Sequence, residues 1–417
     1  MSRAGSAYDL SMRPSLLALG GSTARLAAIL GAALGCGGGS DADPDAGGGS
    51  GDAGLPDAAP VDAALAPVPL TLDLLTEPTT ADEVTDVRAA WEARDTAARD
   101  VTVEATGSTA LGDVPMTYVV LAHTVGGLRH VGAVLVPDGL SSPASAPVLI
   151  YAHGGLTVEG GLPPLPAEEL ASRVPDGPLR GQLVYVIPAY RGERIEVDGV
   201  AYAAEGTPSL GDREVDDVMA LLSAALAEVP EADPDRVAVL GESRGGLVAL
   251  ELGARDPRVD LVLDAFGPTD FRIGLVSSGV DEALFQASVR QALAAPDDLA
   301  TLLLRSIVPI DQVSEGDDGE LLISAAGRRA LRENLARSAP LTYAADLPVT
   351  ETHHGTADGT AAVEYSRALA DAMAAAGRPS PGPSFTYFEY EGGGHDLATL
   401  PGAVERFGEA IERVLTP

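Results

Sequence analysis

Apolar runs and amphipathic stretches alternate along most of this chain. Short continuous apolar runs, typical of buried strands, lie at Val148–Ala152, Leu183–Pro188, Val237–Leu240, Leu261–Ala265, Leu347–Thr350 and Phe385–Tyr390. Residues 212–227 instead repeat apolar positions at helical spacing, with Val215, Val218, Met219, Leu222, Ala225 and Leu226 on one face. Strands that alternate with helices predict an α/β fold with a mainly parallel sheet and helices on both of its faces.

The segment ahead of these runs has its own pattern. Thr80 to Arg99 reads as a helix and contains the only tryptophan, Trp91. Strand-like runs follow at Val101–Ala105, Met116–Ala122 and Val131–Val136. We therefore expect one helix and three further strands before the alternating part begins.

An insertion separates the run ending at Ala265 from the one beginning at Leu347. Residues 281–339 contain predicted helices at Asp281–Ala294, Pro296–Ile307 and Leu321–Arg337, with apolar faces that include Leu302, Leu303, Leu304 and Ile307. We expect a helical cap that lines an acyl or alcohol pocket. The alternative is an ordinary peripheral layer of helices.

The first residues have the pattern of an export signal. Arg25 precedes the apolar stretch 26–34, which is too short to span a bilayer and ends in small residues at Cys36. Residues 1–36 are therefore predicted to be a signal peptide. Its Leu-Gly-Cys ending resembles a bacterial lipobox, in which the cysteine carries the lipid. The alternative is an ordinary signal peptide with a chance cysteine.

Residues 37–67 predict a flexible tether. They are Gly, Ala, Asp, Ser and Pro with little to bury, and such a composition cannot offset the entropy of the chain. The folded domain would then be residues 68–417. We expect an exported protein, lipid-anchored through Cys36 to the periplasmic or outer face of the bacterial cell envelope, that meets the membrane only through this anchor.

The composition excludes several kinds of chemistry. All 27 basic residues are arginine, so no P-loop lysine, Schiff-base lysine or Ser-Lys dyad is present. Cys36 is the only cysteine, which leaves the folded domain without a thiol nucleophile, a cysteine zinc site or a disulfide. The net charge of −34 argues against nucleic acid as a partner. Nothing in the sequence indicates a metal or an organic cofactor.

The stretch Gly241-Glu242-Ser243-Arg244-Gly245 lies between an apolar strand-like run and a helix-like run. A strand, a sharp turn and a helix would place Ser243 on an exposed elbow, with glycines that leave room for the crowded backbone. A serine in this position attacks a carbonyl carbon when a nearby base takes its proton. The alternative is a serine that caps an ordinary helix.

Two residues complete this interpretation. Asp358 follows the strand-like run at 347–350, and His395 follows the run at 385–390. His395 would take the proton of Ser243, and Asp358 would fix the tautomer of His395. The order Ser, Asp, His is that of the α/β-hydrolases. Asp346 and Asp396 are competing candidates for the acid.

The oxyanion formed by such an attack needs hydrogen-bond donors. His153-Gly154-Gly155-Leu156 follows the strand-like run at 148–152, and a glycine pair after a strand lets backbone N–H groups turn toward a developing charge. The N–H groups of Gly155 and Arg244 are the predicted donors. The N–H of Leu156 is the alternative to that of Gly155.

The remaining polar residues near these motifs have structural interpretations. We expect His153 and His354 to orient local backbone. A metal site at His353-His354 is disfavoured, because adjacent strand residues point to opposite faces. Arg191 would brace its loop, or alternatively bind a substrate carboxylate. Asp264 is a strand-end residue rather than a second acid.

From about residue 100 onward the chain resembles the catalytic domain of the prolyl oligopeptidase-like (dienelactone hydrolase-like) serine α/β-hydrolases. The motifs that carry this resemblance are Tyr151-Ala152-His153-Gly154-Gly155, Tyr190-Arg191-Gly192, Gly241-Glu242-Ser243-Arg244-Gly245-Gly246, His354-Gly355-Thr356-Ala357-Asp358 and Gly394-His395. The resemblance implies an α/β-hydrolase fold, Ser243 as nucleophile, Asp358 as acid, His395 as base, and Gly155 and Arg244 as oxyanion donors.

The peptidases of that family also carry a β-propeller, for which the region before Val148 is too short. The glutamate pair that grips a peptide amino terminus in the dipeptidyl peptidases belongs to that propeller. Single-domain relatives are mostly esterases. We therefore expect a serine hydrolase that cleaves small carboxylic esters through an acyl-enzyme. The alternatives are a peptidase acting on short peptides, an acyltransferase, and a non-catalytic binding protein.

Overall fold

The computed structural model describes residues 66–140, 143–158, 161–295 and 299–416. The predicted signal peptide, Cys36 and nearly all of the tether lie outside the described residues. In the described part, no helix is both long enough and apolar enough to cross a membrane.

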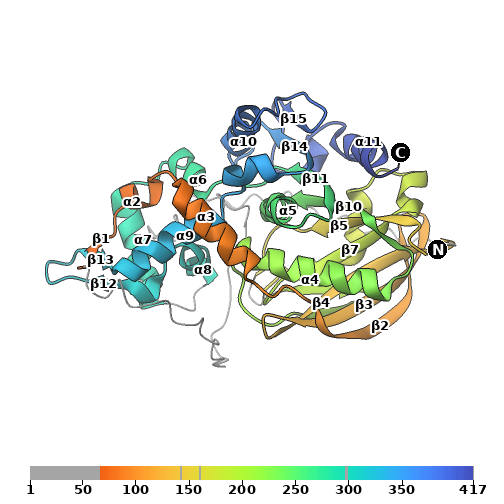
Figure 1. The fold of residues 1–417 in the computed structure, drawn as a ribbon, viewed down its shortest axis with the longest axis horizontal. Coiled ribbons are helices and arrows are strands. Elements are labelled where there is room, and N and C mark those ends of the chain that lie inside the picture. The colour runs from red at the N-terminus through yellow and green to blue at the C-terminus, as the bar shows by residue number, and fades with distance from the viewer. Residues whose placement is uncertain (1–65, 141–142, 159–160, 296–298, 417) are drawn as a thin grey trace, which may run out of the picture.

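A nine-stranded sheet forms the centre of the molecule, in the order β15-β14-β11-β10-β5-β7-β4-β3-β2 (Figure 1). Its strands are β2 (Arg99–Leu111), β3 (Val114–Val125), β4 (Leu128–Pro137), β5 (Ala146–Ala152), β7 (Val184–Ala189), β10 (Ala232–Glu242), β11 (Val259–Ala265), β14 (Val349–Gly355) and β15 (Phe385–Tyr390). The strands from β15 to β7 are parallel, and β4, β3 and β2 pair antiparallel. The prediction of a mainly parallel sheet is confirmed.

The antiparallel end follows from its short connections. A two-residue turn can join only antiparallel neighbours, and the turn between β3 and β4 consists of Gly126 and Gly127, both with positive φ. Glycine adopts this left-handed conformation without a steric penalty.

Helices cover both faces of the sheet, as predicted. The helices α4 (Asp212–Glu228), α5 (Arg244–Arg255) and α10 (Glu364–Ala375) pack on one face, and α11 (Ala403–Leu415) packs on the other. Successive side chains of a strand pack into the apolar cores on opposite faces of the sheet. Val184 and Val186 of β7 face the α4 side, whereas Tyr185 and Ile187 face the α11 side.

The insertion between β11 and β14 forms a separate group of elements beside the sheet (Figure 1). We call residues 281–339 the cap. It contains α7 (Glu282–Ala294), α8 (Leu299–Ile307), β12 (Val313–Glu315), β13 (Leu321–Ile323) and α9 (Ala325–Arg337). The third predicted helix was too long at its start, because residues 321–323 pair with β12 and the Ser324 side chain caps the helix that follows.

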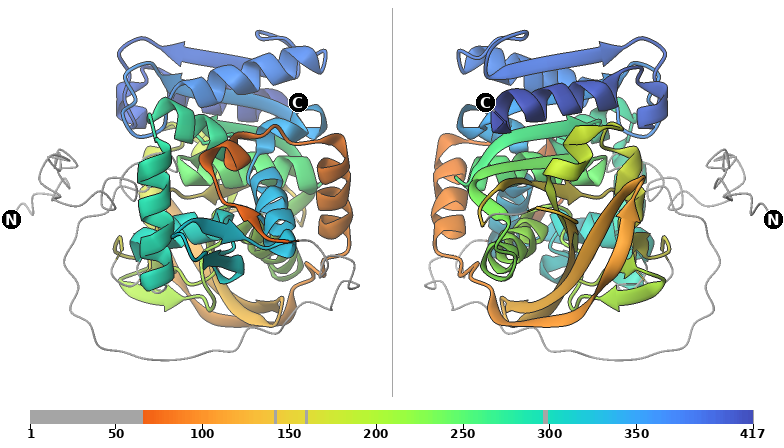
Figure 2. Two further views of the ribbon diagram at one scale, coloured as in Figure 1. Left: turned by 90° about the vertical axis from the view of Figure 1, so that its left-hand side faces the viewer. Right: turned by 90° about the vertical axis from the view of Figure 1, so that its right-hand side faces the viewer.

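Residues 68–92, which we call the strap, tie the N-terminal part of the domain to the cap. They form β1 (Val68–Pro69), α2 (Leu72–Thr76) and α3 (Ala81–Glu92). The helix α3 is shorter than the helix predicted from Thr80 to Arg99. The strand β1 pairs with β13, and Leu70 and Leu75 are buried in the apolar core of the cap. Figure 2 shows this orange segment beside the cyan cap.

Shorter elements complete the described part. They are β6 (Leu165–Pro166), β8 (Arg194–Val197), β9 (Val200–Ala203), α6 (Phe271–Ser277) and the 3-10 helices Ala167–Ser172, Pro178–Gln182, Ile310–Gln312, Pro340–Asp346 and Leu397–Thr399. The strands β6, β8 and β9 form a small sheet of their own.

Candidate active site

Ser243 lies on a sharp turn between β10 and α5. Its backbone has φ 57° and ψ −126°, a conformation that non-glycine residues rarely adopt and that is often found at functional sites. The flanking glycines are required sterically: a Cβ on Gly245 would lie 1.9 Å from the carbonyl oxygen of Ala152, and one on Gly241 would lie 2.1 Å from the carbonyl oxygen of Gly245. Crowding on both sides therefore fixes the elbow that the motif predicted.

The structure brings Ser243, His395 and Asp358 together. The Ser243 hydroxyl donates to Nε2 of His395 over 2.9 Å, and Nδ1–H of His395 donates to Oδ2 of Asp358 over 2.7 Å. The three residues follow β10, β15 and β14, at the carboxyl ends of parallel strands. In such a chain of hydrogen bonds the carboxylate holds the tautomer in which Nε2 accepts the hydroxyl proton.

Asp358 is held as a carboxylate. Its side chain is fully buried, and its Oδ1 accepts the N–H groups of Thr360 and Ala361 over 2.8 and 2.9 Å. Burial would raise the pKa of Asp358, but hydrogen bonds from His354 and His395, together with the Thr360 N–H, bring it below the ordinary carboxyl value. An ionised carboxylate stabilises the imidazolium that forms when the histidine takes a proton.

The two competing acids lie elsewhere. Asp346 forms an ion pair with Arg88 of the strap. Asp396 precedes a short 3-10 helix, and its carboxylate accepts the N–H of Ala398 over 2.9 Å. Of these three aspartates, Asp358 is the one that contacts His395.

The predicted oxyanion donors lie on segments that border Ser243. A Cβ on Gly154 would come within 3.0 Å of the Ser243 Cβ and 2.8 Å of the Glu242 carbonyl oxygen, so the loop after β5 packs directly against the elbow. Gly155, the next residue, has a positive φ of 67°. Arg244 is the first residue of α5, where backbone N–H groups have no partner within the helix.

The other histidines near the site each have at least one local hydrogen-bond partner. His153 hydrogen-bonds through Nδ1 to the Gly154 carbonyl, and His354 hydrogen-bonds to the Ala361 carbonyl and the Ser366 hydroxyl. His353 points the other way along β14, to the hydroxyl of Tyr390. Within the described ranges, no group of three or more histidine, cysteine or acidic side chains is placed to hold a metal ion.

Arg191 and Asp264 both have structural partners. The Arg191 guanidinium donates to Asp217 and to the Arg213 carbonyl, which fits the predicted brace. The buried Asp264 accepts from the Thr352 hydroxyl and the Gly267 N–H, and burial raises its pKa to about 6. Neither side chain belongs to the hydrogen-bonded group around Ser243.

Sequence reasoning did not single out Phe266, which follows β11 and packs against the His395 ring with centroids 4.4 Å apart. Phe266 has a positive φ of 47°, unusual for an aromatic residue. A buried aromatic side chain at this distance limits the orientations of the imidazole. Its position directly after a strand of the parallel sheet is the signal that could have identified it.

Comparison with known proteins identifies a family match in the middle of the chain. Residues 180–262 match the model of the prolyl oligopeptidase family (Peptidase_S9), which confirms the predicted resemblance over the segment that contains Ser243 and Arg191. No curated protein matches the chain.

Solved structures with similar folds come from esterases and peptidases. Acetyl xylan esterase 1 from Thermoanaerobacterium sp. JW/SL YS485 is 16% identical over 83% of this chain and 99% of its own, with a TM-score of 0.49. The esterase LipA from Xanthomonas oryzae is 14% identical over 77% of this chain and 98% of its own, with a TM-score of 0.48. The acylaminoacyl peptidase from Pyrococcus horikoshii is 14% identical over 75% of this chain but 49% of its own, with a TM-score of 0.43.

Proposed function

We propose that this serine hydrolase cleaves small carboxylic esters through an acyl-enzyme formed on Ser243. The observation that carries the proposal is the unbroken chain of hydrogen bonds from the Ser243 hydroxyl through His395 to the buried Asp358. The family match covers residues 180–262, so the participation of His395 and Asp358 rests on this geometry.

In the proposed mechanism His395 accepts the Ser243 proton through Nε2 as the serine oxygen attacks the ester carbonyl carbon. The resulting oxyanion is bound by the N–H of Arg244 and by that of Gly155 or Leu156. Each such donor contributes about 3–4 kcal/mol of transition-state stabilisation. His395 then protonates the departing alcohol, and a water molecule, activated by the same imidazole, hydrolyses the acyl-enzyme.

The described segment ahead of β5 favours esters over peptides. In the described part ahead of β5, residues 66–140 form the strap and three strands of the central sheet. These residues therefore form part of the hydrolase domain and not the propeller that the peptidases of the resembled family carry. Peptidase and acyltransferase activity are the alternatives that use the same residues.

We further propose that the cap shapes the substrate pocket. Its apolar core includes Leu156 and Val158, one and three residues after the proposed donor Gly155, together with Phe285 of α7. Leu162, 37% exposed, reaches the same glycine: a Cβ on Gly155 would lie 2.4 Å from its Cδ1. An apolar wall beside the reacting carbonyl would favour hydrocarbon groups.

The cellular location remains a proposal that rests on the sequence. We propose that residues 1–36 direct export and that Cys36 carries a lipid. Because the strap begins directly after the tether and is built into the cap, the anchor would join the protein on its cap side. Cys36→Ala should move the protein from the membrane fraction to the soluble fraction of the cell envelope. Unchanged membrane association would contradict the lipid anchor.

The test of the reaction class is a comparison of substrates on one enzyme preparation. Hydrolysis of p-nitrophenyl esters of increasing acyl length should far exceed hydrolysis of aminoacyl p-nitroanilides. Faster cleavage of the anilides would favour the peptidase. Acyl transfer to an added alcohol that outpaces hydrolysis would favour the acyltransferase.

A further inference from the structure

The side chain of Arg244 is fully buried behind the loop that carries Gly155. Its Nε donates to the Gly155 carbonyl oxygen over 2.7 Å, and its Nη2 donates to Oε1 of Glu193 over 2.6 Å. The guanidinium also lies 4.8 Å from the centre of the Tyr190 ring. The residue after the nucleophile thus contacts the proposed oxyanion loop with its side chain as well as bordering the site with its backbone.

Glu193 contacts the same loop from the other end. It is fully buried, and its Oε2 accepts the backbone N–H and the hydroxyl of Thr157 over 2.9 and 3.1 Å. The Arg244–Glu193 pair therefore fixes two successive peptide units, one through the Gly155 carbonyl and one through the Thr157 N–H.

Peptide planarity makes this contact directional. In a trans peptide the carbonyl and the following N–H point in opposite directions, so anchoring the Gly155 carbonyl on Arg244 turns the Leu156 N–H away from the guanidinium. In the next unit, the Leu156 carbonyl accepts the N–H of Leu162 while Thr157 donates to Glu193. The orientation of both peptide planes depends on the buried pair.

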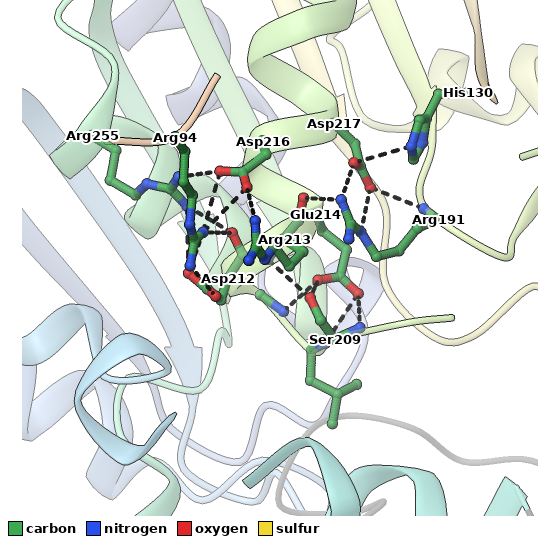
Figure 3. Close-up of polar contacts among 12 residues, drawn as sticks. Arg94, His130, Arg191, Ser209, Asp212, Arg213, Glu214, Asp216, Asp217 and Arg255 are labelled. Atoms are coloured by element: carbon green, nitrogen blue, oxygen red, sulfur yellow. Dashed lines mark hydrogen bonds and ion pairs between the residues drawn. The ribbon is translucent and has the colours of Figure 1, made fainter. Parts of the chain in front are cut away.

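The pair is supported from behind by the first turn of α4. Glu214 Oε1 lies 3.6 Å from Nη1 of Arg244, and the Glu214 carboxylate accepts backbone N–H groups of the turn that precedes the helix. Arg191, two residues before Glu193, is held by Asp217 of the same helix (Figure 3). The segment that carries Glu193 is therefore fixed on a rigid element.

A fully buried ion pair is an expensive way to stabilise a fold, because the cost of removing two charges from water offsets most of their attraction. Buried pairs of this kind are better suited to specifying one geometry. We infer that Arg244 and Glu193 are positioning residues that hold the 155–157 peptide planes so that the Leu156 N–H, the alternative oxyanion donor of this loop, points at the carbonyl attacked by Ser243. This inference rests on the proposed function.

The test uses Arg244→Gln and Glu193→Gln in the full-length protein, both of which keep every backbone N–H. Because displacement of a catalytic group by about 1 Å costs up to roughly 100-fold, kcat on a short p-nitrophenyl ester should fall by about 100-fold in Arg244→Gln. The milder variant Glu193→Gln should have a kcat about tenfold lower than the wild type, as expected for weakening one hydrogen bond to a charged group. KM should change little in either variant, whereas affinity for a boronic acid that mimics the oxyanion should fall in parallel with kcat/KM.

Arg255→Gln is the matched control. Arg255 is on the same helix, and its nearly buried side chain is paired with Asp212 and Asp216 (Figure 3). It is stacked on Trp91 and lies at the last residue of α5, whereas Arg244 is the first. It should lower the melting temperature but leave kcat and boronate affinity unchanged. A loss of kcat in Arg255→Gln equal to that in Arg244→Gln would reduce the role of Arg244 to general stability and overturn the inference.

A double variant separates a shared action from two independent ones. Arg244→Gln/Glu193→Gln should lose no more kcat than the worse single variant, because both residues act on one loop. If both single variants kept wild-type kcat while Ser243→Ala was inactive, the inference would be wrong and the proposed function would stand. An active Ser243→Ala would instead refute the proposed function. If Arg244→Gln does not fold, the kcat and the boronate affinity of Glu193→Gln alone decide whether the inference holds.

Discussion

The central sheet and the helices on its faces, which we call the body, differ at the active site from the core of the cap in the kind of group that they bury. At the carboxyl ends of the body's strands, charged groups are buried and paired, with Asp358 bound to His395 and Arg244 to Glu193. The core of the cap is apolar side chains, among them the fully buried Phe285. Polar networks specify one geometry, whereas apolar packing mainly fills volume. Around the reacting atoms the chain thus uses buried charge pairs for alignment. The core of the cap is packed with apolar groups, and its buried Arg332 pairs outward with Glu83 of the strap.

This contrast assigns different consequences to substitutions in the two regions. Changes in the body should lower kcat with little effect on the range of substrates. Changes in the cap should alter stability and the binding of longer acyl or alcohol groups.

The largest effect is expected for Ser243→Ala. Loss of a triad serine removes the covalent route altogether, so kcat on any ester should fall by about a millionfold. The melting temperature should stay close to that of the wild type, because a hydroxyl replaced by hydrogen leaves the packing intact. Steady-state turnover and thermal unfolding of the same preparation measure both. A variant that kept a substantial part of the wild-type kcat would require another nucleophile.

Asp358→Asn should be the next most damaging change. An amide at this position favours the wrong tautomer of His395, and the expected loss in kcat is about ten-thousandfold. Asp346→Asn and Asp396→Asn are the controls, since these residues pair with Arg88 and with a backbone N–H instead. If either control lost as much kcat as Asp358→Asn, the assignment of Asp358 as the catalytic acid would be contradicted.

In the cap, Phe285→Ala should act on stability and substrate range. Removing a fully buried phenylalanine costs about 3–5 kcal/mol, here from the apolar core that includes Leu156. We expect kcat on an acetyl ester to be kept and KM for a long-chain ester to rise. Leu293→Ala, a 36% exposed position on the same helix, is the control. Equal loss of kcat on short and long esters would contradict the separation of the two regions.

The smallest effect is expected at the junction of strap and cap, as a pH dependence of stability. Hydrogen bonds from Arg332 lower the pKa of Glu83 to about 2. A carboxyl whose pKa is depressed in the folded state stabilises the fold fully above its unfolded value, and this contribution is lost as the pH falls toward the folded value. The difference in unfolding free energy between wild type and Glu83→Gln should therefore be largest near neutral pH and shrink below about pH 4.

Denaturant unfolding at several pH values measures this difference, with the exposed Glu92 on the same helix, changed to Gln, as the control. If the wild type and Glu83→Gln differed by the same amount at every pH, the ion pair with Arg332 would not contribute as described.

The sequence predicted the parallel strands well, and its motifs named the residues that the structure brings together around Ser243, because both depend on local patterns. It predicted β14 poorly. This strand runs to Gly355 through Thr352, His353 and His354, whose polar side chains are buried on partners elsewhere in the chain, such as Asp264, Tyr390 and Ser366. An apolar-run criterion cannot recognise a strand whose buried groups are satisfied by distant hydrogen bonds.

The pairing of strap and cap could not be predicted from the sequence, for a similar reason. Val68 lies beside Ile323, and nothing in two short segments so far apart in the chain encodes their register. The motif at the elbow indicated the backbone of Arg244 but not the partner of its side chain. Glu193 belongs to a loop whose approach to Gly155 depends on the whole sheet.

The most direct test of the account is labelling by a fluorophosphonate probe followed by peptide mass spectrometry, on wild type and on Ser243→Ala. The probe reacts with serines activated by a neighbouring base. We expect one adduct in the wild type, on the peptide that contains Ser243, and none in the variant. Labelling of Ser243→Ala at the wild-type rate, or an adduct on another residue, would contradict it.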